Sequence, residues 1–287
     1  MSSSSDIRRR IRSIGSTAQI TKAMQMVAAS KMRKAQEAAL AGRPFVRLIY
    51  RFQREATTAT REFNHPLLDV RQIQRRAVIL VAADKGLCGA LNSNLFRLAA
   101  QFDPASTVFI TAGRKAAQFV AATRRQLIAE FAYGDSPTFP EARAIAAFAR
   151  DLFLKKKVDE VRVLATRFIN TLTQVPVSLE FLPVGEIRGL EIPGAELEMD
   201  LDARKETLFE PGPAAFLSYL LSHYLNIYIY QVLLNAKASE QSARMVSMKS
   251  ATDNAENLID DLTLEYNKLR QANITKELLE IAGGQAG

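Results

Sequence analysis

Hydrophobic positions near the C-terminal end of the chain recur at alternating spacings of three and four residues, a mean period of about 3.5. The positions that share this stripe are Met245, Met248, Thr252, Ala255, Ile259, Leu262, Tyr266 and Leu269. The residues between them are largely polar or charged, as at Lys249, Asp253 and Glu256. Such a stripe with polar flanks is typical of a helix that packs lengthwise on another helix in a coiled coil.

The stripe belongs to an unusually long segment without helix-breaking residues. From Ala214 to Ala282 there is neither proline nor glycine, whereas Pro213 precedes this segment and Gly283 follows it. Proline at the start and glycine just past the end are the expected limits of one helix. As a single helix the segment would be about 100 Å long, so we expect it to project and to need a partner along its side. The alternative, an ordinary amphipathic helix packed on a domain, is disfavoured by this length.

A second stripe with the same spacing predicts a long helix from Asp6 to about Phe63. Its positions are Ile7, Ile11, Ile14, Ala18, Thr21, Gln25, Ala28, Met32, Ala35 and Ala39. Thr21 and Gln25 are polar breaks that weaken the seam and are expected to fix its register instead. Gly42 and Pro44 are expected to bend or interrupt the helix. The simplest arrangement is that the two terminal helices pair antiparallel into a stalk.

Between the terminal helices, short apolar runs alternate with helical patterns. The expected strands are Ala77–Ala83, Thr107–Thr111, Gln126–Phe131, Glu160–Ala165 and Val175–Leu182. The expected helices are Leu91–Phe102, Arg114–Ala122 and Glu141–Lys155. This alternation predicts an α/β fold class, a Rossmann-like domain with a mainly parallel sheet of about five strands, inserted into a coiled coil. The expected boundaries are 1–65 for the N-terminal helix, 66–212 for the α/β domain and 213–287 for the C-terminal helix.

Composition narrows the class of protein. The net charge is +8, yet the first 55 residues alone contain twelve lysines and arginines against three acids. The N-terminal helix is therefore the basic surface, which favours an acidic partner; a solvated charged face and nucleic acid are the alternatives. Nucleic acid is disfavoured because no aromatic residue precedes Phe45 and no zinc or helix-turn-helix spacing is present. A single cysteine, Cys88, excludes an intramolecular disulfide, and the two histidines form no Cys/His cluster with the spacing of a structural zinc site.

Neither a membrane span nor a secretory signal is predicted. The most apolar segment, Leu217–Leu234, contains Ser218, His223, Asn226 and Gln231 among its polar residues. That is too polar for a helix that faces lipid. The N-terminus is charged and has no apolar core behind it, so we expect no signal peptide.

One turn is a candidate site for nucleotide binding. Asp84–Asn92 follows the first expected strand and contains two glycines, at the place where phosphate binds in nucleotide folds. Its spacing matches neither the dinucleotide fingerprint nor the P-loop, which favours a purely structural turn. Cys88 in this turn is expected to pack rather than to react, because the sequence offers no supporting base. We find no catalytic pair and expect no cofactor and no metal.

Several segments resemble the gamma subunit of F-type ATP synthases. They occur in order along essentially the whole chain: Ile20–Met32, Asp84–Gly89, Phe168–Thr171 with Gln174–Pro176, Ser239–Met245, Ala251–Asn254 and Arg270–Leu278. Ala83 and Ala90 depart from the family pattern, which often has a small polar residue or glycine there. The regulatory insertion with paired cysteines found in chloroplast proteins is missing, so thiol switching is not expected.

The resemblance implies a non-catalytic rotor shaft. The paired helices would lie inside a ring of three alpha and three beta subunits, and the α/β domain would contact the epsilon subunit and the membrane c-ring. Rotation would transmit torque between ion flow through the membrane ring and ATP synthesis in the hexamer. The protein would lie peripherally on the cytoplasmic face of a bacterial plasma membrane, without nucleic acid and without a span of its own. A nucleotide-binding α/β enzyme with a coiled-coil oligomerisation stalk remains the alternative.

Matching positions suggest roles for individual residues. Those implied to contact beta subunits are Lys22, Met24, Arg270 and Gln271. Those implied to couple rotation to catalysis are Arg244, Thr275 and Glu277. An apolar tip inserted in a sleeve is expected at Ile274, Leu278, Leu279 and Ile281, with a frayed chain end as the alternative. Glu210 resembles the foot region that faces the membrane ring.

Overall fold

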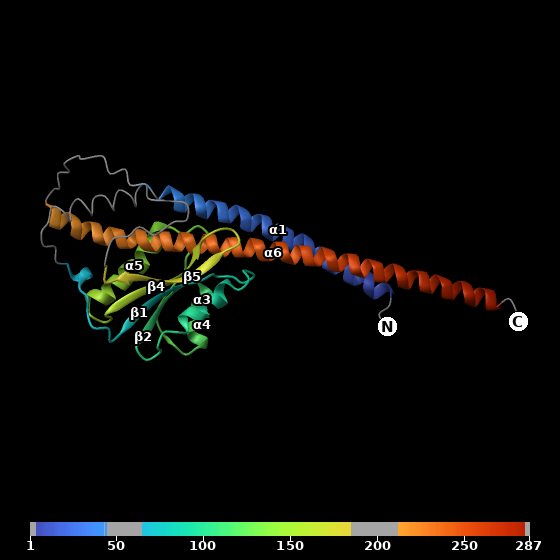
Figure 1. Ribbon diagram of the computed structural model, residues 1–287, viewed down its shortest axis with the longest axis horizontal. Coiled ribbons are helices and arrows are strands. Elements are labelled where there is room, and N and C mark those ends of the chain that lie inside the picture. The colour runs from blue at the N-terminus through green and yellow to red at the C-terminus, as the bar shows by residue number, and fades with distance from the viewer. Residues whose placement is uncertain (1–3, 43, 45–64, 185–211, 285–287) are drawn as a thin grey trace. The chain divides into compact units, whose positions relative to one another are not determined.

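The computed structural model describes residues 4–42, 44, 65–184 and 212–284 (Figure 1). The helices are α1 (Ser4–Ala41), the short 3-10 helix η1 (Pro66–Leu68), α3 (Leu91–Ala99), α4 (Arg114–Ala122), α5 (Phe139–Leu154) and α6 (Pro213–Gly284). The strands are β1 (Arg76–Val81), β2 (Thr107–Ala112), β3 (Gln126–Phe131), β4 (Glu160–Phe168) and β5 (Gln174–Leu182). The predicted fold class is confirmed, with two long helices on either side of an α/β segment in the sequence.

The C-terminal helix follows its predicted limits closely, and the N-terminal helix begins near its predicted start and ends at the predicted break. Helix α6 is continuous over 72 residues, so the segment without proline and glycine is a single helix. Helix α1 ends at Ala41, directly before Gly42, as the glycine and Pro44 predicted. A Cβ atom on Gly42 would collide with the side-chain amide of Gln231 on α6, so any larger residue here requires the Gln231 side chain to move. The expected continuation of the first helix, at residues 45–64, lies outside the described residues.

The five strands form one sheet in the order β3-β2-β1-β4-β5. Neighbouring strands from β3 to β4 run parallel, and β5 pairs antiparallel with β4 at the edge. The continuous apolar run in β1 is explained by its central place, because a strand covered on both faces needs no polar alternation. All five residues from Ala77 to Val81 are at most 1% exposed.

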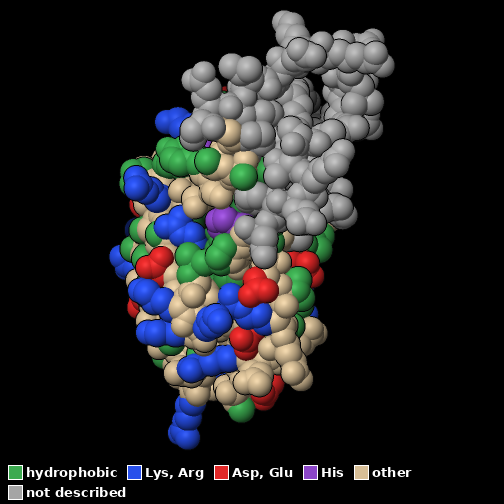
Figure 2. All heavy atoms as spheres, turned by 90° about the vertical axis from the view of Figure 1, so that its left-hand side faces the viewer, with side chains coloured by type: hydrophobic (Ala, Val, Ile, Leu, Met, Phe, Trp, Pro, Cys, Tyr) green, Lys and Arg blue, Asp and Glu red, His purple; other side chains and the backbone are tan. Residues whose placement is uncertain are grey.

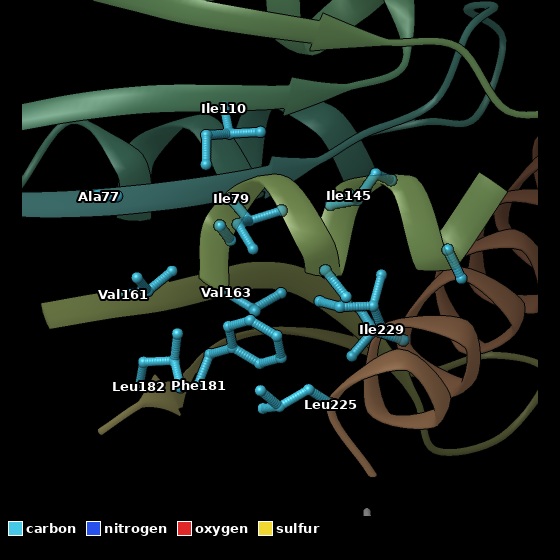
Figure 3. Packing of buried hydrophobic residues seen from close by; sticks show 14 of the residues in the cluster. Ala77, Ile79, Ile110, Ile145, Val161, Val163, Phe181, Leu182, Leu225 and Ile229 are labelled. Carbon is cyan, nitrogen blue, oxygen red and sulfur yellow. The ribbon is translucent and has the colours of Figure 1, made fainter. Parts of the chain in front are cut away.

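Alternate residues of the central strands point into two separate cores. Val78 and Leu80 face helices α3 and α4, together with Phe109. On the other face, Ile79 and Val163 belong to the large core under α5 and α6. Figure 3 shows Ile145 of α5 and Ile229 of α6 directed towards these sheet residues. Burying each such aliphatic side chain contributes roughly 1.5–3 kcal/mol, which holds α6 against the sheet.

The segment Leu217–Leu234, the most apolar part of the chain, packs on this second core. Leu217, Leu221, Leu225, Ile229 and Leu233 are all at most 2% exposed. No helix in the described ranges is long and apolar enough to cross a bilayer. The hydrophobicity of this part of α6 is therefore explained by its contact with the sheet.

By its internal contacts the chain divides into two units. One contains residues 1–28 and 244–287, which are the first part of α1 and the last part of α6. The other contains residues 29–243, with the α/β fold, the end of α1 and the first part of α6. The three-part division into 1–65, 66–212 and 213–287 stays a prediction.

Candidate functional site

In the first unit, α1 and α6 pair side by side and run in opposite directions. The hydroxyls of Thr21 and Thr252 lie 2.7 Å apart. A Cβ on Gly15 would lie 4.0 Å from Cδ1 of Ile259, and the guanidinium of Arg8 lies 5.6 Å from the ring centre of Tyr266. Residue numbers fall along α1 as they rise along α6, so the predicted antiparallel pairing is confirmed for this unit.

The predicted stripes form the seam between these helices. On α1, Ile7, Ala18 and Ala28 are buried, whereas Ile11 and Ile14 are half-buried. On α6 the buried seam positions are Met248, Thr252 and Ala255, and the half-buried ones are Met245, Ile259, Leu262, Tyr266 and Leu269. The intervening polar residues, such as Asp253, Glu256 and Lys268, are exposed. Small residues at the buried positions let the helix backbones approach closely, and the larger ones fill the seam further along.

The polar break at Thr21 is satisfied within the seam. Thr21 and Thr252 share one hydrogen bond, and the Thr252 hydroxyl also lies 2.9 Å from the Met248 carbonyl of its own helix. Thr252 is only 5% exposed, and each hydroxyl also contacts a carbonyl of its own helix, Ala18 for Thr21 and Met248 for Thr252. A helix shift would therefore cost the hydrogen bond between the two hydroxyls without leaving either of them unpaired. This geometry supports the prediction that Thr21 fixes the register of the pair.

In the second unit, both long helices are tied to the α/β fold by an ionic group that we term the Asp135 cluster. It consists of Lys31 of α1, Tyr133 and Asp135 after β3, and Lys237 and Glu240 of α6. Nζ of Lys237 lies 3.0 Å from a carboxylate oxygen of Glu240 and 3.6 Å from one of Asp135. Nζ of Lys31 lies 2.5 Å from the other Asp135 oxygen. One carboxylate therefore contacts an ammonium group from each long helix.

Lys237 is only 1% exposed, and the contacts with Asp135 and Glu240 offset part of the cost of removing its ammonium group from water. Its ammonium group also lies 4.8 Å from the ring centre of Tyr133, a cation–π contact. The Tyr133 hydroxyl donates a hydrogen bond to the Ala82 carbonyl, and burial holds the pKa of this phenol well above its usual value. The hydrogen bond from Lys31 lowers the pKa of Asp135, against the opposing effect of its partial burial, and the Lys237 charge lowers it further.

Two of the motifs singled out in the sequence meet in the structure. The Ser239 hydroxyl donates to the Thr166 carbonyl at 3.1 Å, and the Ser242 hydroxyl donates to the Thr171 carbonyl at 2.8 Å. Nε2 of Gln174 lies 3.4 Å from the same Ser242 oxygen. The small polar side chains of α6 thus bind the hairpin between β4 and β5, where a longer side chain would hold the helix away.

The glycine-bearing turn after β1 serves packing. Cys88 is 2% exposed and clusters with Ala83, Leu91 and Ala243. Nδ2 of Asn92 donates to its sulfur at 3.5 Å. In open α/β folds ligands bind beyond the carboxyl ends of the strands, where the order of strands reverses. Here Ala243 of α6 packs against that turn, which favours the structural interpretation of Asp84–Asn92 over nucleotide binding.

Comparison with known proteins places the chain in a family. A family model described as ATP synthase matches residues 3–287. The "ATP synthase gamma chain" of Opitutus terrae is 46% identical over 99% of this chain and 98% of its own length. That of Methylacidiphilum infernorum is 41% identical over 99% of both chains. The chain belongs to the ATP synthase gamma-chain family.

Solved structures share the fold at lower identity. A chain of the Euglena gracilis mitochondrial ATP synthase, in an assembly titled OSCP/F1/c-ring, has a TM-score of 0.68 and 18% identity over 98% of this chain and 92% of its own. A central-stalk chain from Tetrahymena thermophila has a TM-score of 0.61 and 24% identity, covering 81% of this chain and 99% of its own. The combination of long terminal helices and an α/β domain thus recurs in these chains.

The residues implied to contact beta subunits are accessible in the structure. Lys22, Arg270 and Gln271 are exposed, and Met24 is half-buried. Lys22 and Met24 lie on α1, whereas Arg270 and Gln271 lie near the end of α6. The structure does not bring the two pairs together into one site, and their contact with beta subunits stays a prediction.

The other predicted positions have different environments. Arg244 is 8% exposed, so it is a buried residue rather than an open contact. Thr275 is exposed, and its hydroxyl donates to the Gln271 carbonyl at 2.9 Å. At the expected tip, Ile274, Leu278 and Leu279 are 49%, 61% and 67% exposed, respectively. The side chains of Glu277 and Ile281, and Glu210 as a whole, lie outside the described residues.

The sequence pattern does not predict the Asp135 cluster. Lys237 and Glu240 are three residues apart on α6, and this spacing was a signal that they face each other. Asp135 lies in a loop more than one hundred positions away from both Lys31 and Lys237 in the sequence. Its meeting with Lys31 and Lys237 depends on the packing of three elements, which no local pattern reveals.

Proposed function

We propose that the chain is the central-stalk rotor subunit of an F-type ATP synthase and does no bond chemistry itself. The observation that carries the proposal is the antiparallel seam of α1 and α6, joined by the Thr21–Thr252 hydrogen bond, in a member of the gamma-chain family. Two packed helices resist bending and twisting better than one. In this role the pair would transmit torque between the membrane ring and the catalytic hexamer, so that ion flow drives ATP synthesis.

The Asp135 cluster would be where torque enters the two long helices. A rotor needs the domain that receives rotation to be joined firmly to both helices of its shaft. Asp135 holds Lys31 of α1 and Lys237 of α6 from a loop that is fixed to the sheet by the Tyr133 hydrogen bond. Deformation of the α/β domain against either helix would separate these charges, and for buried Lys237 that separation is costly.

The partners in this proposal are three alpha and three beta subunits, an epsilon subunit and the membrane c-ring. Lys22, Met24, Arg270 and Gln271 would contact beta subunits, and Arg244, Thr275 and Glu277 would couple rotation to catalysis. Exposed Ile274, Leu278 and Leu279, with Ile281, would be covered by an apolar sleeve in the hexamer. Glu210 would face the ring. The complex would place the chain peripherally on the cytoplasmic face of a bacterial plasma membrane.

Purification of the tagged chain from its own cells tests this assignment. We expect alpha and beta subunits to co-purify at three copies each per copy of this chain, as measured by native mass spectrometry. A complex of different stoichiometry, or recovery of the chain without alpha and beta subunits, would contradict the proposal. Calorimetry on the isolated chain with a Gly86→Val variant would then test the alternative, nucleotide binding at the turn after β1.

A further inference from the structure

One end of the sheet carries a basic surface within the unit formed by residues 29–243. It is the end at which the strands begin, on the left-hand side of Figure 1. Figure 2 faces this side and shows that lysine and arginine side chains predominate over acidic ones. Three segments there, 70–75, 124–126 and 154–157, lead into β1, β3 and β4, respectively. We term their exposed residues the strand-start surface.

Hydrogen bonds hold these segments together. The carboxylate of Asp159 accepts the backbone N–H group of Arg75 at 2.9 Å, and the Arg75 guanidinium donates to Oε1 of Gln126 at 3.0 Å. The guanidinium of Arg71 donates to the Phe153 carbonyl, at the end of α5, at 3.0 Å. The strand-start surface is therefore one continuous face rather than three separate loops.

The carboxylates beside this surface are occupied by the fold, whereas several cations are not. Asp159 accepts backbone N–H groups, and Glu160 pairs with two arginines. Within the described ranges, no carboxylate lies within ion-pair distance of Arg124, Lys156 or Lys157. These three side chains are exposed, so the surface keeps positive charge that nothing in the described chain balances.

The helix ends explain only part of this composition. Arg124 and Lys156 lie just beyond the last turns of α4 and α5, where the negative end of a helix favours a cation. That role needs one cation per helix and does not account for Lys157. The surface also contains aliphatic side chains that are 82%, 50% and 40% exposed, at Val70, Ile73 and Leu154, respectively. Cations interspersed with exposed aliphatic side chains are typical of surfaces that bind an anionic membrane.

The strand-start surface lies at the end of this unit away from the point where α6 leaves it. Near the start of β4, the ring of Phe181 on the neighbouring strand lies 5.7 Å from that of Tyr228. Near the end of β4, the Thr166 carbonyl accepts the hydroxyl of Ser239. Residue numbers on α6 thus rise away from the strand-start surface. In the proposed rotor, on which this step rests, α6 continues towards the catalytic hexamer, so the strand-start surface faces the membrane.

We propose that the strand-start surface makes a weak, reversible contact with the headgroups of anionic lipids. Each cation close to such a membrane strengthens binding by about fivefold, and Val70 and Ile73 reach between the headgroups. Interfaces between proteins are depleted in lysine, so the exposed run Lys155–Lys157 suits lipid headgroups better than the loops of a membrane protein. Because each cation adds little, the contact breaks and re-forms as the domain turns.

Co-sedimentation of the full-length chain with vesicles tests this proposal, with pure phosphatidylcholine compared with an equal mixture of phosphatidylcholine and phosphatidylglycerol. We expect binding only to the mixed vesicles. Lys156→Gln/Lys157→Gln should weaken it by about twentyfold, since two cations are removed. Val70→Ser/Ile73→Ser keeps the charge and should weaken it by about fourfold or more, the effect of one buried CH₂ group. Unchanged binding by this second variant would overturn the role of the aliphatic side chains.

The matched control is Lys249→Gln/Lys268→Gln, which removes the same two charges from exposed positions on α6. Binding that is kept in this control and lost in Lys156→Gln/Lys157→Gln supports the surface. Equal loss in both double variants would reveal a general charge effect and overturn the proposal, as would absence of binding by the unaltered chain. Binding only to phosphatidylcholine vesicles that carry the purified membrane ring would assign the surface to a protein contact and overturn it too.

The vesicle assay separates this proposal from the assignment as a rotor. It uses the chain without other subunits, so failure to bind lipid leaves the co-purification with alpha and beta subunits unaffected. Conversely, lipid binding by a chain that does not co-purify with them would support the surface and contradict the rotor.

Discussion

Lys237 shows how a single buried charge can hold two parts of this protein together. Its ammonium group is enclosed by Glu240, Asp135 and the ring of Tyr133, and it is 1% exposed. A methionine of similar length would fill the same space without the cost of removing a charge from water. The presence of lysine is therefore best explained by the link that it makes between α6 and the loop after β3, rather than by burial.

We expect Lys237→Met to destabilise the chain by about 3–5 kcal/mol, because Glu240 loses the buried cation beside it. The midpoint of denaturant unfolding measures this change. Lys237→Met combined with Glu240→Gln should recover part of the loss. Lys249→Met, at an exposed position of the same helix, should change stability by no more than about 0.5 kcal/mol. Equal effects of the two lysine variants would show that the Asp135 cluster contributes nothing.

The pKa of Asp135 reports the contact with α1. The hydrogen bond from Lys31 lowers this pKa below its usual value of 3.8, despite partial burial. A carboxyl with a lowered pKa stabilises the fold above its unfolded pKa, and this contribution is lost as the pH falls through the folded pKa. We therefore expect Lys31→Met to raise the pKa of Asp135 in a carboxyl-carbon NMR titration. Lys34→Met, at an exposed position one turn further along α1, should leave the titration unchanged; a shift of equal size would exclude a specific contact.

For single residues, the sequence pattern identified important positions but rarely the residues that they contact. Thr21 was identifiable as a polar break because it interrupts an apolar stripe of regular period. Its partner Thr252 belongs to the other stripe, so antiparallel pairing brought them together only once the register was known. Lys31 and Lys237 looked like ordinary charges, since their burial and pairing are decided by the loop that carries Asp135.

At the scale of elements, the seam between α1 and α6 depends on a narrow apolar stripe. Leu262 is a half-buried seam position, whereas Leu264 on the same helix is 59% exposed. The two leucines are two residues apart and so point to different sides of the helix. The same substitution at both positions therefore separates the effect of disrupting the seam from the effect of adding a charge to the helix.

We expect Leu262→Asp to splay the helix pair and to reduce coupled ATP synthesis by complexes reconstituted into vesicles. Placing a carboxylate at this half-buried seam position costs free energy, because a charge leaves water without a partner. Leu264→Asp should leave synthesis close to that of the unaltered complex. Retained synthesis in correctly assembled Leu262→Asp complexes would count against the seam as the torque-bearing element.

Most elements were predictable because their patterns are local. Helix α4 and strand β3 have the predicted limits, and Gly42 with Pro44 marked the end of α1. The predicted helix Leu91–Phe102 ends earlier, at Ala99. The order of strands and the antiparallel direction of β5 were not predicted, since they depend on long-range pairing with β4.

At the scale of the whole molecule, the exposed residues near the end of α6 have no structural role in the described chain that would explain them. Arg270 and Gln271 are exposed, and so are the apolar residues that follow at Ile274 and Leu278. Exposed apolar residues that follow a polar pair on one helix suit a surface covered by other subunits. The sequence pattern alone indicated an apolar surface at this end of the helix. The partner that would cover it was inferred from the family resemblance and not from the structure.

We expect Arg270→Ala/Gln271→Ala to lower the turnover of ATP hydrolysis by the assembled complex without changing the melting temperature of the chain. Both side chains are exposed, so their removal should cost little stability. Asn267→Ala/Lys268→Ala, one turn earlier and equally exposed, is the control and should leave turnover unchanged. Normal ATP hydrolysis by the Arg270→Ala/Gln271→Ala complex would contradict the assignment of these two residues as a contact with beta subunits.

Direct observation of rotation tests the central claim, that this chain is a rotor. Cys88 is buried, so a cysteine introduced at the exposed position Gln101 of the α/β domain offers a selective attachment point for a bead. With the alpha and beta subunits fixed to a surface, we predict that ATP makes the bead turn stepwise in one direction. A bead that stays fixed relative to the hexamer while ATP is hydrolysed would contradict the account.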